Sequence, residues 1–471
     1  MRLTRLLATT AIVSIAAAPA FADIRPVVNT FTELAHDLRG LTFAADGKVY
    51  ASGHIGANET ASTVVVRFNA DGTLDVNFAG DGVADIDVAA GRIESSLGVV
   101  ELDNGDVVVA VNAQDEDGGQ SVYLLRFNAA GEQVTEWGED GRVEVVFGWA
   151  NADNAGYTGT APPEDTAWDL LIDRTGDAER LVVFGFGSAP NGSGRTDGDR
   201  YVVRLDAATG AVDPGFNGGA AFSFHVGGTF GDNARRGLIE ADGAIVAAGY
   251  SNLGDGLGNH IVLFRLLPDG TLDQSFGNFI NPESTGTAVG LAAQPGVAIF
   301  NPFLVDGGMA ECYAVGRLSD GSYVTTGYGL ATGSGRESTL GYLTSLQPDL
   351  VAFQVNGTEV STTWGNNGTQ AVQSEGKVQP TNEDRGRAMV VLADDRTVHV
   401  GRYGGNAAAF VLTADGQLDT SVDGDGIIVL GHPVVGSQFF TAVLSADGTR
   451  IAMTTNADTG GARLVILEVA E

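Results

Sequence analysis

The sequence predicts an all-β fold, a seven-bladed β-propeller built from four-stranded antiparallel blades. A phrase centred on Asp-Gly and Leu-Asp returns along the chain at 67–82, 265–277 and 412–426, and such self-similarity indicates a repeat fold. Short Val-rich runs alternate with turn residues, and glycine is frequent, at 67 residues. Both features favour β-strands joined by tight turns.

Each repeat unit is expected to contain four strands. In the first unit these strands occupy 39–43, 48–53, 63–68 and 82–88. Asp46-Gly47 joins the first two, because Asp-Gly between alternating runs is a strong signal for a hairpin turn. The Asp-Gly-Thr-Leu-Asp phrase then turns the chain from the third strand into the fourth.

The first strand of the unit recurs at seven places along the chain: Gly40, Gly98, Asp169, Gly237, Ala314, Ala388 and Thr441. Four-stranded units repeated about four to eight times are typical of a β-propeller. An open β-solenoid is the alternative architecture. It is disfavoured because solenoid repeats usually span about 20–45 residues, and the units here are longer.

The two ends of the chain are expected to meet in the last unit. That unit supplies strands at 440–444, 450–454 and 462–469 and then stops, so its fourth strand is missing. The extended run 24–30 belongs to no other unit, and as the outer strand of the last blade it would close the ring. Pro26 is tolerated there, because an outermost strand leaves one side of its backbone unpaired.

Residues 1–22 are interpreted as a signal peptide. Arg2 and Arg5 give a positive start, 6–17 is a short apolar run, and Ala20-Phe21-Ala22 is a small-residue cleavage pattern. The mature chain, 23–471, is then a single propeller domain in the periplasm or the medium. No later stretch approaches the roughly 18 apolar residues of a membrane span, so no membrane insertion is expected.

The net charge limits the kinds of partner that the protein can bind, and the cysteine count limits its disulfide bonds. The net charge of −33 repels nucleic acid and anionic lipid. Cys312 is the one cysteine in the sequence, so no intramolecular disulfide can form, and it is interpreted as a buried apolar residue. The protein is expected to be a monomer whose partner is a protein, a glycan or a small polar ligand.

The repeated phrase resembles that of a known family. Arg67-Phe68-Asn69-Ala70-Asp71-Gly72-Thr73-Leu74-Asp75, together with Phe78 and the run Ala45 to Gly53, is similar to the delta-sixty repeat family of bacterial β-propellers. The likeness extends over nearly the whole mature chain and departs in the fifth unit, where Leu343-Thr344-Ser345-Leu346 lacks the Arg and Trp364-Gly365 replaces Phe-Gly. The resemblance implies the fold and export, and it implies no catalytic residue.

The residues that recur in this phrase are interpreted as structural. One aromatic per unit is expected to fill the space between adjacent sheets: Phe78, Trp137, Phe216, Phe276 and Trp364. The recurring Arg67, Arg126, Arg204 and Arg265 are expected to pair with repeat carboxylates such as Asp75 and Asp273. Ligand stacking by the aromatics and anion binding by the arginines are the alternatives.

The Asp-rich turns also allow a calcium hypothesis. Asp71, Asp75 and Asp81 in one unit, and Asp419, Asp423 and Asp425 in another, offer the oxygen ligands that Ca²⁺ prefers. The spacing is not that of an EF-hand loop. Asp and Gly dominate turns for backbone reasons alone, so a turn role is favoured and no cofactor is expected.

Every long connection is expected on one face of the disc, since 148–165, 187–200, 278–309 and 329–338 all join second to third or fourth to first strands. Binding residues concentrate on variable loops held by a rigid scaffold. The candidate partner residues on these loops are Trp149, Tyr157, Phe279, Phe300 and Phe303.

The central channel opens on the same face, and charged and aromatic residues begin its first strands. The candidate funnel residues are His36, Arg39, Glu94, Asp165, Trp168, Arg236, Tyr313, Asp384 and Arg387, with Arg235 and Arg385 beside them. They could hold a small polar or anionic ligand, because the planar fork of Arg grips carboxylate or phosphate. They could equally form a salt-bridged plug that closes the channel.

Three classes of function remain open. The first is a binding module that acts through the loop-bearing face. The second is an enzyme, a lyase or hydrolase, with its site in the funnel around His36, Arg39, Arg236 and Arg387. The third is a structural envelope or surface component. The sequence contains no catalytic triad pattern, phosphate loop or local metal-binding pair of histidines, so the binding module is favoured.

Overall fold

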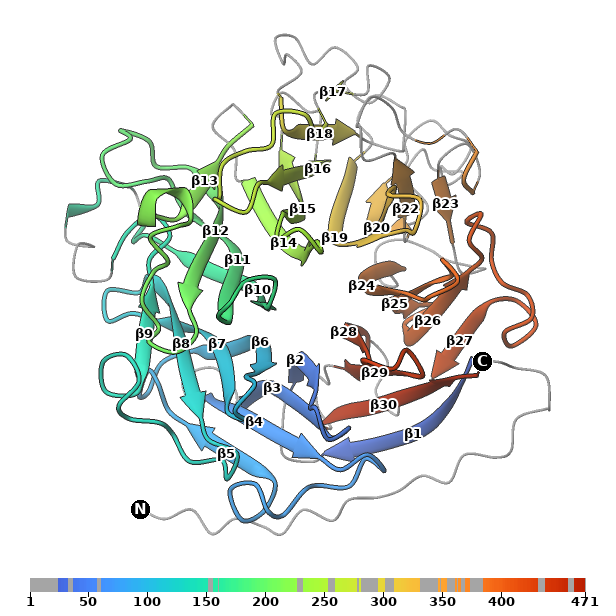
Figure 1. Cartoon of the computed structure of the whole chain (residues 1–471), viewed down its shortest axis with the longest axis horizontal. Helices are drawn as coiled ribbons and strands as arrows, with labels where there is room; N and C mark the ends of the chain where they lie inside the picture. The colour runs from blue at the N-terminus through green and yellow to red at the C-terminus, as the bar shows by residue number, and fades with distance from the viewer. Residues whose placement is uncertain are drawn as a thin grey trace, which may run out of the picture.

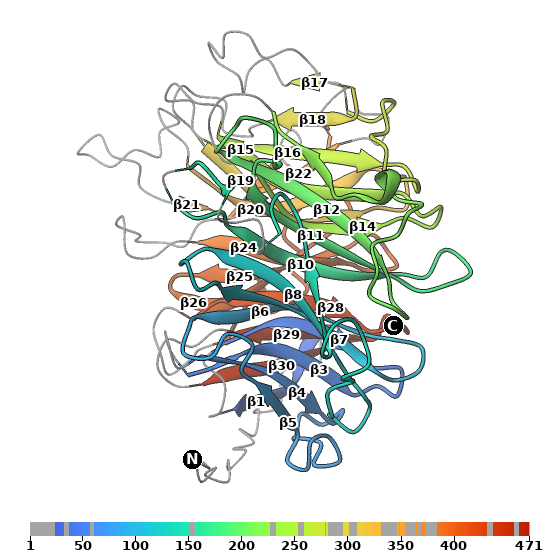
Figure 2. The same cartoon turned by 90° about the vertical axis from the view of Figure 1, so that its left-hand side faces the viewer.

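The computed structural model describes the chain in segments that together outline a ring of β-sheets. They are 24–32, 37–56, 61–150, 156–159, 161–226, 232–252, 259–277, 279–280, 295–300, 309–330, 346–347, 349–353, 361, 363–365, 369–372, 384–430, 437–455 and 461–470. The expected signal peptide 1–22, His36 and Phe303 lie outside the described residues, as does the side chain of Phe279. The sheets are arranged in a ring around a central axis (Figure 1), and Figure 2 views the same disc from its rim.

The first three units form regular sheets in which each strand pairs antiparallel with the next. The first sheet contains β2 (Asp37–Phe43), β3 (Val49–Ile55), β4 (Ser62–Phe68) and β5 (Val83–Ile86). The second contains β6 (Glu94–Glu101), β7 (Val107–Gln114), β8 (Gln120–Phe127) and β9 (Arg142–Val145). The third contains β10 (Asp165–Asp173), β11 (Arg180–Ser188), β12 (Gly198–Asp206) and β13 (Phe222–Phe224), with a 3₁₀ turn at Asn217–Gly219 before β13.

The fourth and sixth units follow the same order. The fourth sheet contains β14 (Asp232–Ile239), β15 (Ile245–Asn252), β16 (Asn259–Leu266) and β18 (Val297–Phe300), and β17 (Phe279–Ile280) adds a parallel strand beside β18. The sixth contains β24 (Arg385–Val391), β25 (Thr397–Tyr403), β26 (Asn406–Leu412) and β27 (Ile427–Leu430). The all-β propeller of four-stranded antiparallel blades is therefore confirmed.

The fifth unit is irregular. It contains β19 (Met309–Arg317), β20 (Tyr323–Leu330), β21 (Leu346–Gln347), β22 (Asp349–Phe353) and β23 (Thr369–Ala371). β22 meets β20 only where Tyr323 pairs with Phe353 and Val324 with Ala352. Within the described residues, six sheets are thus complete blades instead of the seven expected. The irregular unit is the one in which the sequence departs from the family resemblance.

The last blade is closed by the N-terminal strand, as the sequence predicts. β28 (Phe439–Leu444), β29 (Arg450–Thr455) and β30 (Ala462–Val469) are followed in the sheet by β1 (Ile24–Thr32), which pairs antiparallel with β30. The register shifts between Pro26 and Val28. An apolar cluster that includes Leu464 and Val64 joins this blade to the first, so the first and last sheets pack together.

The repeated phrase forms the joint between neighbouring blades. Arg67 Nε lies 2.7 Å from Asp75 Oδ2, and the Arg67 guanidinium lies 5.0 Å from the ring centre of the buried Phe78. Arg67 Nη1 also donates a hydrogen bond of 2.8 Å to the carbonyl of Ala129 in the second blade. Arg204 repeats this arrangement with Asp213, Phe216 and the carbonyl of Pro268. The structural interpretation of these recurring residues is confirmed.

The innermost strand of every sheet carries a β-bulge at an equivalent place. In each strand the pairing with its neighbour skips one residue, and these residues are Arg39, Leu97, Trp168, Arg235, Tyr313, Arg387 and Phe440. A bulge leaves one residue unpaired and redirects its side chain. All seven lie near the start of their strands, on the face of the disc where the long connections are expected. We call these seven residues the mouth ring.

Among the described residues, no helix is both long and apolar enough to cross a bilayer.

Candidate functional site at the mouth of the channel

Six of the mouth-ring residues alternate between aromatic rings and guanidinium groups. In ring order they are Trp168, Arg235, Tyr313, Arg387, Phe440 and Arg39. Arg235 lies 3.6 Å from the ring centre of Trp168 and 5.2 Å from that of Tyr313. Arg387 lies 4.4 Å from the ring centre of Tyr313 and 5.5 Å from that of Phe440. Arg39 lies 4.6 Å from Phe440. Cation–π contacts therefore link six blades around the axis.

Arg235 is the most enclosed cation of the ring. Its residue is 8% exposed, and its Nη2 donates a hydrogen bond to the hydroxyl of Tyr250 at 2.5 Å. Its Nε and Nη1 atoms are buried and find no hydrogen-bond acceptor among the described residues. A buried donor without a partner costs free energy. These two N–H groups could be satisfied by an acceptor that a ligand supplies.

Arg387 lies among like charges. Burial lowers its pKa to about 10, and the guanidiniums of Arg385 and Arg235 act in the same direction while Tyr313 acts against them. Arg387 Nε donates a hydrogen bond of 3.3 Å to Oε1 of Gln438. Arg385 in turn stacks 4.5 Å from the ring centre of Tyr328. Three guanidiniums thus share this side of the mouth.

Glu311 faces the same side but is held by neutral donors. It accepts hydrogen bonds from the Tyr313 hydroxyl at 2.7 Å and from Nδ2 of Asn259 at 2.6 Å. Burial raises the pKa of Tyr313 to about 12, so its hydroxyl keeps its proton. Because these donors orient Glu311, its carboxylate is not paired one-to-one with Arg235 or Arg387.

A different arrangement surrounds Arg39. Arg39 Nε lies 2.6 Å from Oδ2 of the buried Asp37, and His54 Nδ1 lies 2.7 Å from Oδ1 of the same carboxylate. Burial would raise the pKa of Asp37, but the contacts with His54 and Arg39 outweigh it and hold that pKa below its ordinary value. The sequence singled out Arg39 for the funnel, and the structure adds Asp37 and His54 beside it.

Arg236, the residue after Arg235, closes the channel beneath the mouth ring. Its Nη1 donates a hydrogen bond of 3.0 Å to Thr441 Oγ1, and its Nη2 donates one of 3.0 Å to the carbonyl of Phe440. The carboxyl of Asp169 supplies a favourable charge from the neighbouring blade. Arg236 also lines a cavity of about 370 Å³ inside the channel. Arg236 therefore crosses the channel as a plug would, while the ligand-holding role of the funnel residues stays a prediction.

Three of the four acidic residues that precede the bulges link one blade to the blade before it. Glu94 accepts a hydrogen bond of 3.1 Å from the backbone N–H of Val88, and Asp165 one of 3.0 Å from that of Phe147. Asp232 accepts one of 2.9 Å from the N–H of Val226, whereas Asp384 accepts one of 2.8 Å from the N–H of Gly404 in its own blade. Burial raises the pKa of Glu94 to about 7 and that of Asp165 to about 8. The structure places Glu94, Asp165 and Asp384 against backbone donors.

A sequence signal for these four acidic residues exists, although sequence reasoning did not use it. In four units an acidic residue lies three positions before the mouth-ring residue: Glu94 before Leu97, Asp165 before Trp168, Asp232 before Arg235 and Asp384 before Arg387. The pattern becomes meaningful once the bulges are known, because they set the common reference position.

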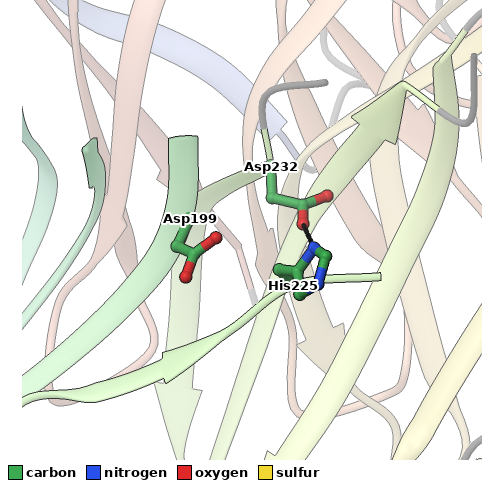
Figure 3. A group of neighbouring side chains, drawn as sticks. All are labelled: Asp199, His225 and Asp232. Carbon is green, nitrogen blue, oxygen red and sulfur yellow. Dashed lines mark ion pairs between the residues drawn. The ribbon is translucent and has the colours of Figure 1, made fainter. Parts of the chain in front are cut away.

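One group of side chains in the described part has the spacing of metal ligands. Asp199, His225 and Asp232 bring one ligand atom each within 4.8 Å of one another (Figure 3). Both carboxylates already have cationic partners, since Arg195 Nη2 lies 2.5 Å from Asp199 and Arg200 Nη2 lies 2.9 Å from Asp232. A divalent ion would add positive charge beside two guanidiniums. The group is therefore better explained as an ion-pair network between β12 and β14.

The aspartates of the Asp-rich turns accept hydrogen bonds from backbone N–H groups of the same turns. Asp71 Oδ1 accepts hydrogen bonds from the N–H of Thr73 at 3.0 Å and from its hydroxyl at 2.6 Å. Asp419 does the same for Ser421. Asp81 and Asp425 each accept a bond from the residue two positions on. These contacts are those of Asx turns.

The loop aromatics whose side chains the structure describes, Trp149, Tyr157 and Phe300, lie in different surroundings. Trp149 packs edge-on against Tyr157 at 5.1 Å, and its Nε1 donates a hydrogen bond of 3.0 Å to the carbonyl of Ala189. Phe300 is 1% exposed and lies on β18 within the apolar core between the fourth and fifth blades. The expectation that Phe300 is a surface contact residue is corrected, because its position on a strand turns the side chain into the junction.

Comparisons with known proteins bear on the fold. No curated protein matches the chain. The crystal structure of the C-terminal WD40 domain of Sif2 shares 8% identity at a TM-score of 0.42, over 96% of this chain and 100% of that one. The crystal structure of polysaccharide lyase Uly1 shares 9% identity at a TM-score of 0.47, over 92% of this chain and 90% of that one. At TM-scores below 0.5, neither likeness carries an argument about this chain.

A family model matches two repeats of the chain. It is described as a domain of unknown function (DUF5122) beta-propeller, and it matches residues 44–78 and 240–276. Both stretches end in the phrase with the repeat Arg, the Leu-Asp pair and the junction Phe. The chain thus carries β-propeller repeats of the DUF5122 family, the delta-sixty type that its sequence resembles.

Proposed function

We propose that this protein is an exported seven-bladed propeller that works as a binding module, with its ligand site at the mouth ring. One observation carries the proposal: bulges on the seven innermost strands lie at one end of the channel, and six of the seven bulged residues are arginine or aromatic. Ligand sites typically combine aromatic walls with a few placed polar groups. The rigid blades fix these groups before any ligand arrives.

A small polar ligand fits this site better than a protein partner. Phe300 is buried, and Trp149 and Tyr157 pack on each other and on the connection between β11 and β12. The side chains that converge instead lie around the axis, where the plug of Arg236 ends the accessible channel. A ligand that enters from the loop-bearing face would therefore rest on the mouth ring.

Export and the seventh blade belong to the same proposal. Export is supported by the features of a signal peptide: Arg2, Arg5, the apolar run 6–17 and the cleavage pattern at Ala20-Phe21-Ala22. Supporting seven blades are the seven bulged strands, including β19 of the irregular unit. N-terminal sequencing of protein recovered from the periplasm or medium should begin at Asp23. Recovery of intact Met1 from the cytoplasm would contradict export.

A ligand screen tests the site. A library of small neutral, cationic and anionic molecules is measured by thermal shift on the wild type, and each hit is repeated on Trp168→Ala and Arg387→Ala. Hits should lose their shift in both variants and keep it in Arg92→Ala, whose side chain lies on the same face away from the ring. Hits that persist in both ring variants would overturn the site. A library without hits would favour a structural component.

An enzyme is the second candidate, favoured by the contact of His54 with Asp37 beside Arg39. A carboxylate that orients a histidine is the arrangement used for general acid–base catalysis. A lyase or hydrolase would use His54 to move the proton and Arg39 to hold an anionic group. If a screen hit is turned over, His54→Gln should abolish turnover while binding persists. Turnover unchanged in His54→Gln would exclude this role.

A further inference from the structure

We propose that the mouth ring binds the oxyanion group of a small organic acid, with Arg235 and Arg387 as its principal contacts. This inference rests on the proposed function, which places the ligand site at the ring, and adds the chemical class of the ligand. It is carried by the charge of the site, by the unpartnered donors of Arg235 and by the stacked geometry of both guanidiniums.

The first argument is charge. The positive charges of Arg235 and Arg385 both act on Arg387. Like charges disfavour each other's ionised form. Glu311 supplies negative charge on this side, but it is held by Tyr313 and Asn259. An anion between Arg235 and Arg387 would relieve this repulsion, whereas a cationic ligand would increase it. The local charge is opposite to the net charge of −33 carried by the chain.

The second argument is the pair of unsatisfied donors. Arg235 is nine-tenths buried, yet its Nε and Nη1 find no acceptor among the described residues. The two gripping edges of a guanidinium are Nε with Nη2 and Nη1 with Nη2, and Nη2 is already bonded to the Tyr250 hydroxyl. Nε and Nη1 therefore each have one hydrogen bond to offer, on different edges. An anion oxygen supplies the acceptor that the described residues do not give to these donors.

The third argument is preorganisation. The face of Arg235 is held 3.6 Å from the ring centre of Trp168, and that of Arg387 is 4.4 Å from the ring centre of Tyr313. Stacking fixes the plane of each guanidinium, so its N–H groups point within that plane and little rotamer freedom is lost on binding. Bulges anchor both residues to the sheets. The site is thus built before the anion arrives.

The ligand is small because the channel is blocked below the ring. Arg236 spans from β14 to β28 and leaves a cavity of about 370 Å³ inside the channel. The acid group would sit at the ring and the remainder of the molecule would extend toward the loop-bearing face. A carboxylate and a phosphate ester share the required oxyanion chemistry, and the experiment separates them.

The test uses ligands that differ in charge and little in shape. Benzoate, benzamide and benzamidinium are titrated into the full mature chain by calorimetry, with phenyl phosphate and inorganic phosphate as the phosphate arm. Benzoate or phenyl phosphate should bind, and the neutral and cationic analogues should not. Arg235→Ala should weaken the bound anion at least about tenfold, as expected for lost charge-assisted hydrogen bonds. Arg92→Ala should change the affinity less than about twofold.

Further variants keep the result decisive. Arg387→Ala repeats the test if Arg235→Ala folds poorly, and Arg235→Lys keeps the charge but loses the fork, so it should weaken binding partly. If benzamide binds as well as benzoate and Trp168→Ala removes the binding of both, the mouth ring is still the ligand site. The proposal that its ligand is an anion is then wrong. Anion affinity unchanged in Arg235→Ala and Arg387→Ala would overturn the ring as the site. Failure of every anion to bind would overturn this inference.

Discussion

Arg236 on β14 and Thr441 on β28 are joined across the central channel by a hydrogen bond of 3.0 Å from Nη1 to Oγ1. The two residues belong to the fourth and seventh units and are 205 positions apart in sequence. Asp169 on β10 provides the countercharge from the third unit. Residues of three blades therefore tie the inner walls of the ring together, just below the residues proposed to bind the ligand.

Replacing Arg236 by Met should destabilise the protein by about 1–3 kcal/mol, because its hydrogen bonds to Thr441 and Phe440 are lost and Asp169 loses a nearby countercharge. Burial already raises the pKa of Asp169. Urea unfolding measures the change. Arg174→Met is the control, since that side chain is 44% exposed and its ion pairs are worth little. Equal stabilities for the two variants would show that Arg236 does not hold the channel together.

Replacing Phe78 by Ala should cost about 3–5 kcal/mol of the free energy of unfolding. Phe78 is buried in the cluster between the first and second blades, and the Arg67 guanidinium packs on its ring. Val76→Ala, two residues earlier at 63% exposure, should change stability by less than about 0.5 kcal/mol. Chemical denaturation of both variants compares them. A loss at Phe78 no larger than at Val76 would contradict the joint.

Deleting residues 24–32 should lower the melting temperature clearly. β1 covers the outer edge of β30 and contributes the buried Ile24 to the core between the last two blades. Without it, β30 becomes an open edge, which favours association between copies. A synthetic peptide of residues 24–32 added in excess should restore part of the loss. An unchanged melting curve would refute closure by the N-terminal strand.

Stability should fall as the pH rises from 5 to 8, because two buried acids have raised pKa values in the folded state. Burial moves the pKa of Glu94 from 4.5 to about 7 and that of Asp165 from 3.8 to about 8. The folded chain therefore holds protons that the unfolded chain has released. The stability from this difference is complete below the unfolded pKa and is lost as the pH rises through the folded one.

The double variant Glu94→Gln and Asp165→Asn should flatten this dependence, since neither replacement titrates. Each unit of pKa shift corresponds to at most about 1.4 kcal/mol. Melts across pH 5 to 8 measure the slope, with Glu116→Gln as the control because its side chain is 92% exposed. A double variant with the slope of the wild type would assign the pH dependence to other groups.

Chelation should leave the melting temperature unchanged. The carboxylates considered for calcium cap turns, as Asp71 does for Thr73, or pair with arginine, as Asp75 does with Arg67. Melts with EGTA and with added Ca²⁺ compare the two states. A lower melting temperature in EGTA that recovers with Ca²⁺ would establish calcium binding at these turns and reverse this interpretation.

The blade joints could be read from the sequence because their signals are local. Arg67, Asp75 and Phe78 lie within a dozen residues of one another, and the same spacing returns in later units. Repetition alone shows that such residues serve every blade. The closure of the ring could also be predicted, because the last unit is one strand short and the extended run 24–30 belongs to no other unit.

The backbone contacts of Glu94 and Asp165 and the buried position of Phe300 could not be read in the same way. Glu94 and Asp165 were expected at the funnel, yet each side chain turns to a backbone N–H that follows the preceding outer strand. Their direction depends on the path of the connection between two blades. That path varies in length from unit to unit and leaves no repeated signal.

Sequence by itself determined the repeat fold, its four-stranded units, the joints between blades and the closure by the N-terminal run. Tertiary structure alone decided which of the funnel candidates contact one another at the axis. Arg235, Trp168 and Arg387 come from separate units of unlike local sequence. They converge because a bulge at the same place on each inner strand turns one side chain toward the mouth, and only the closed ring brings those places within contact distance.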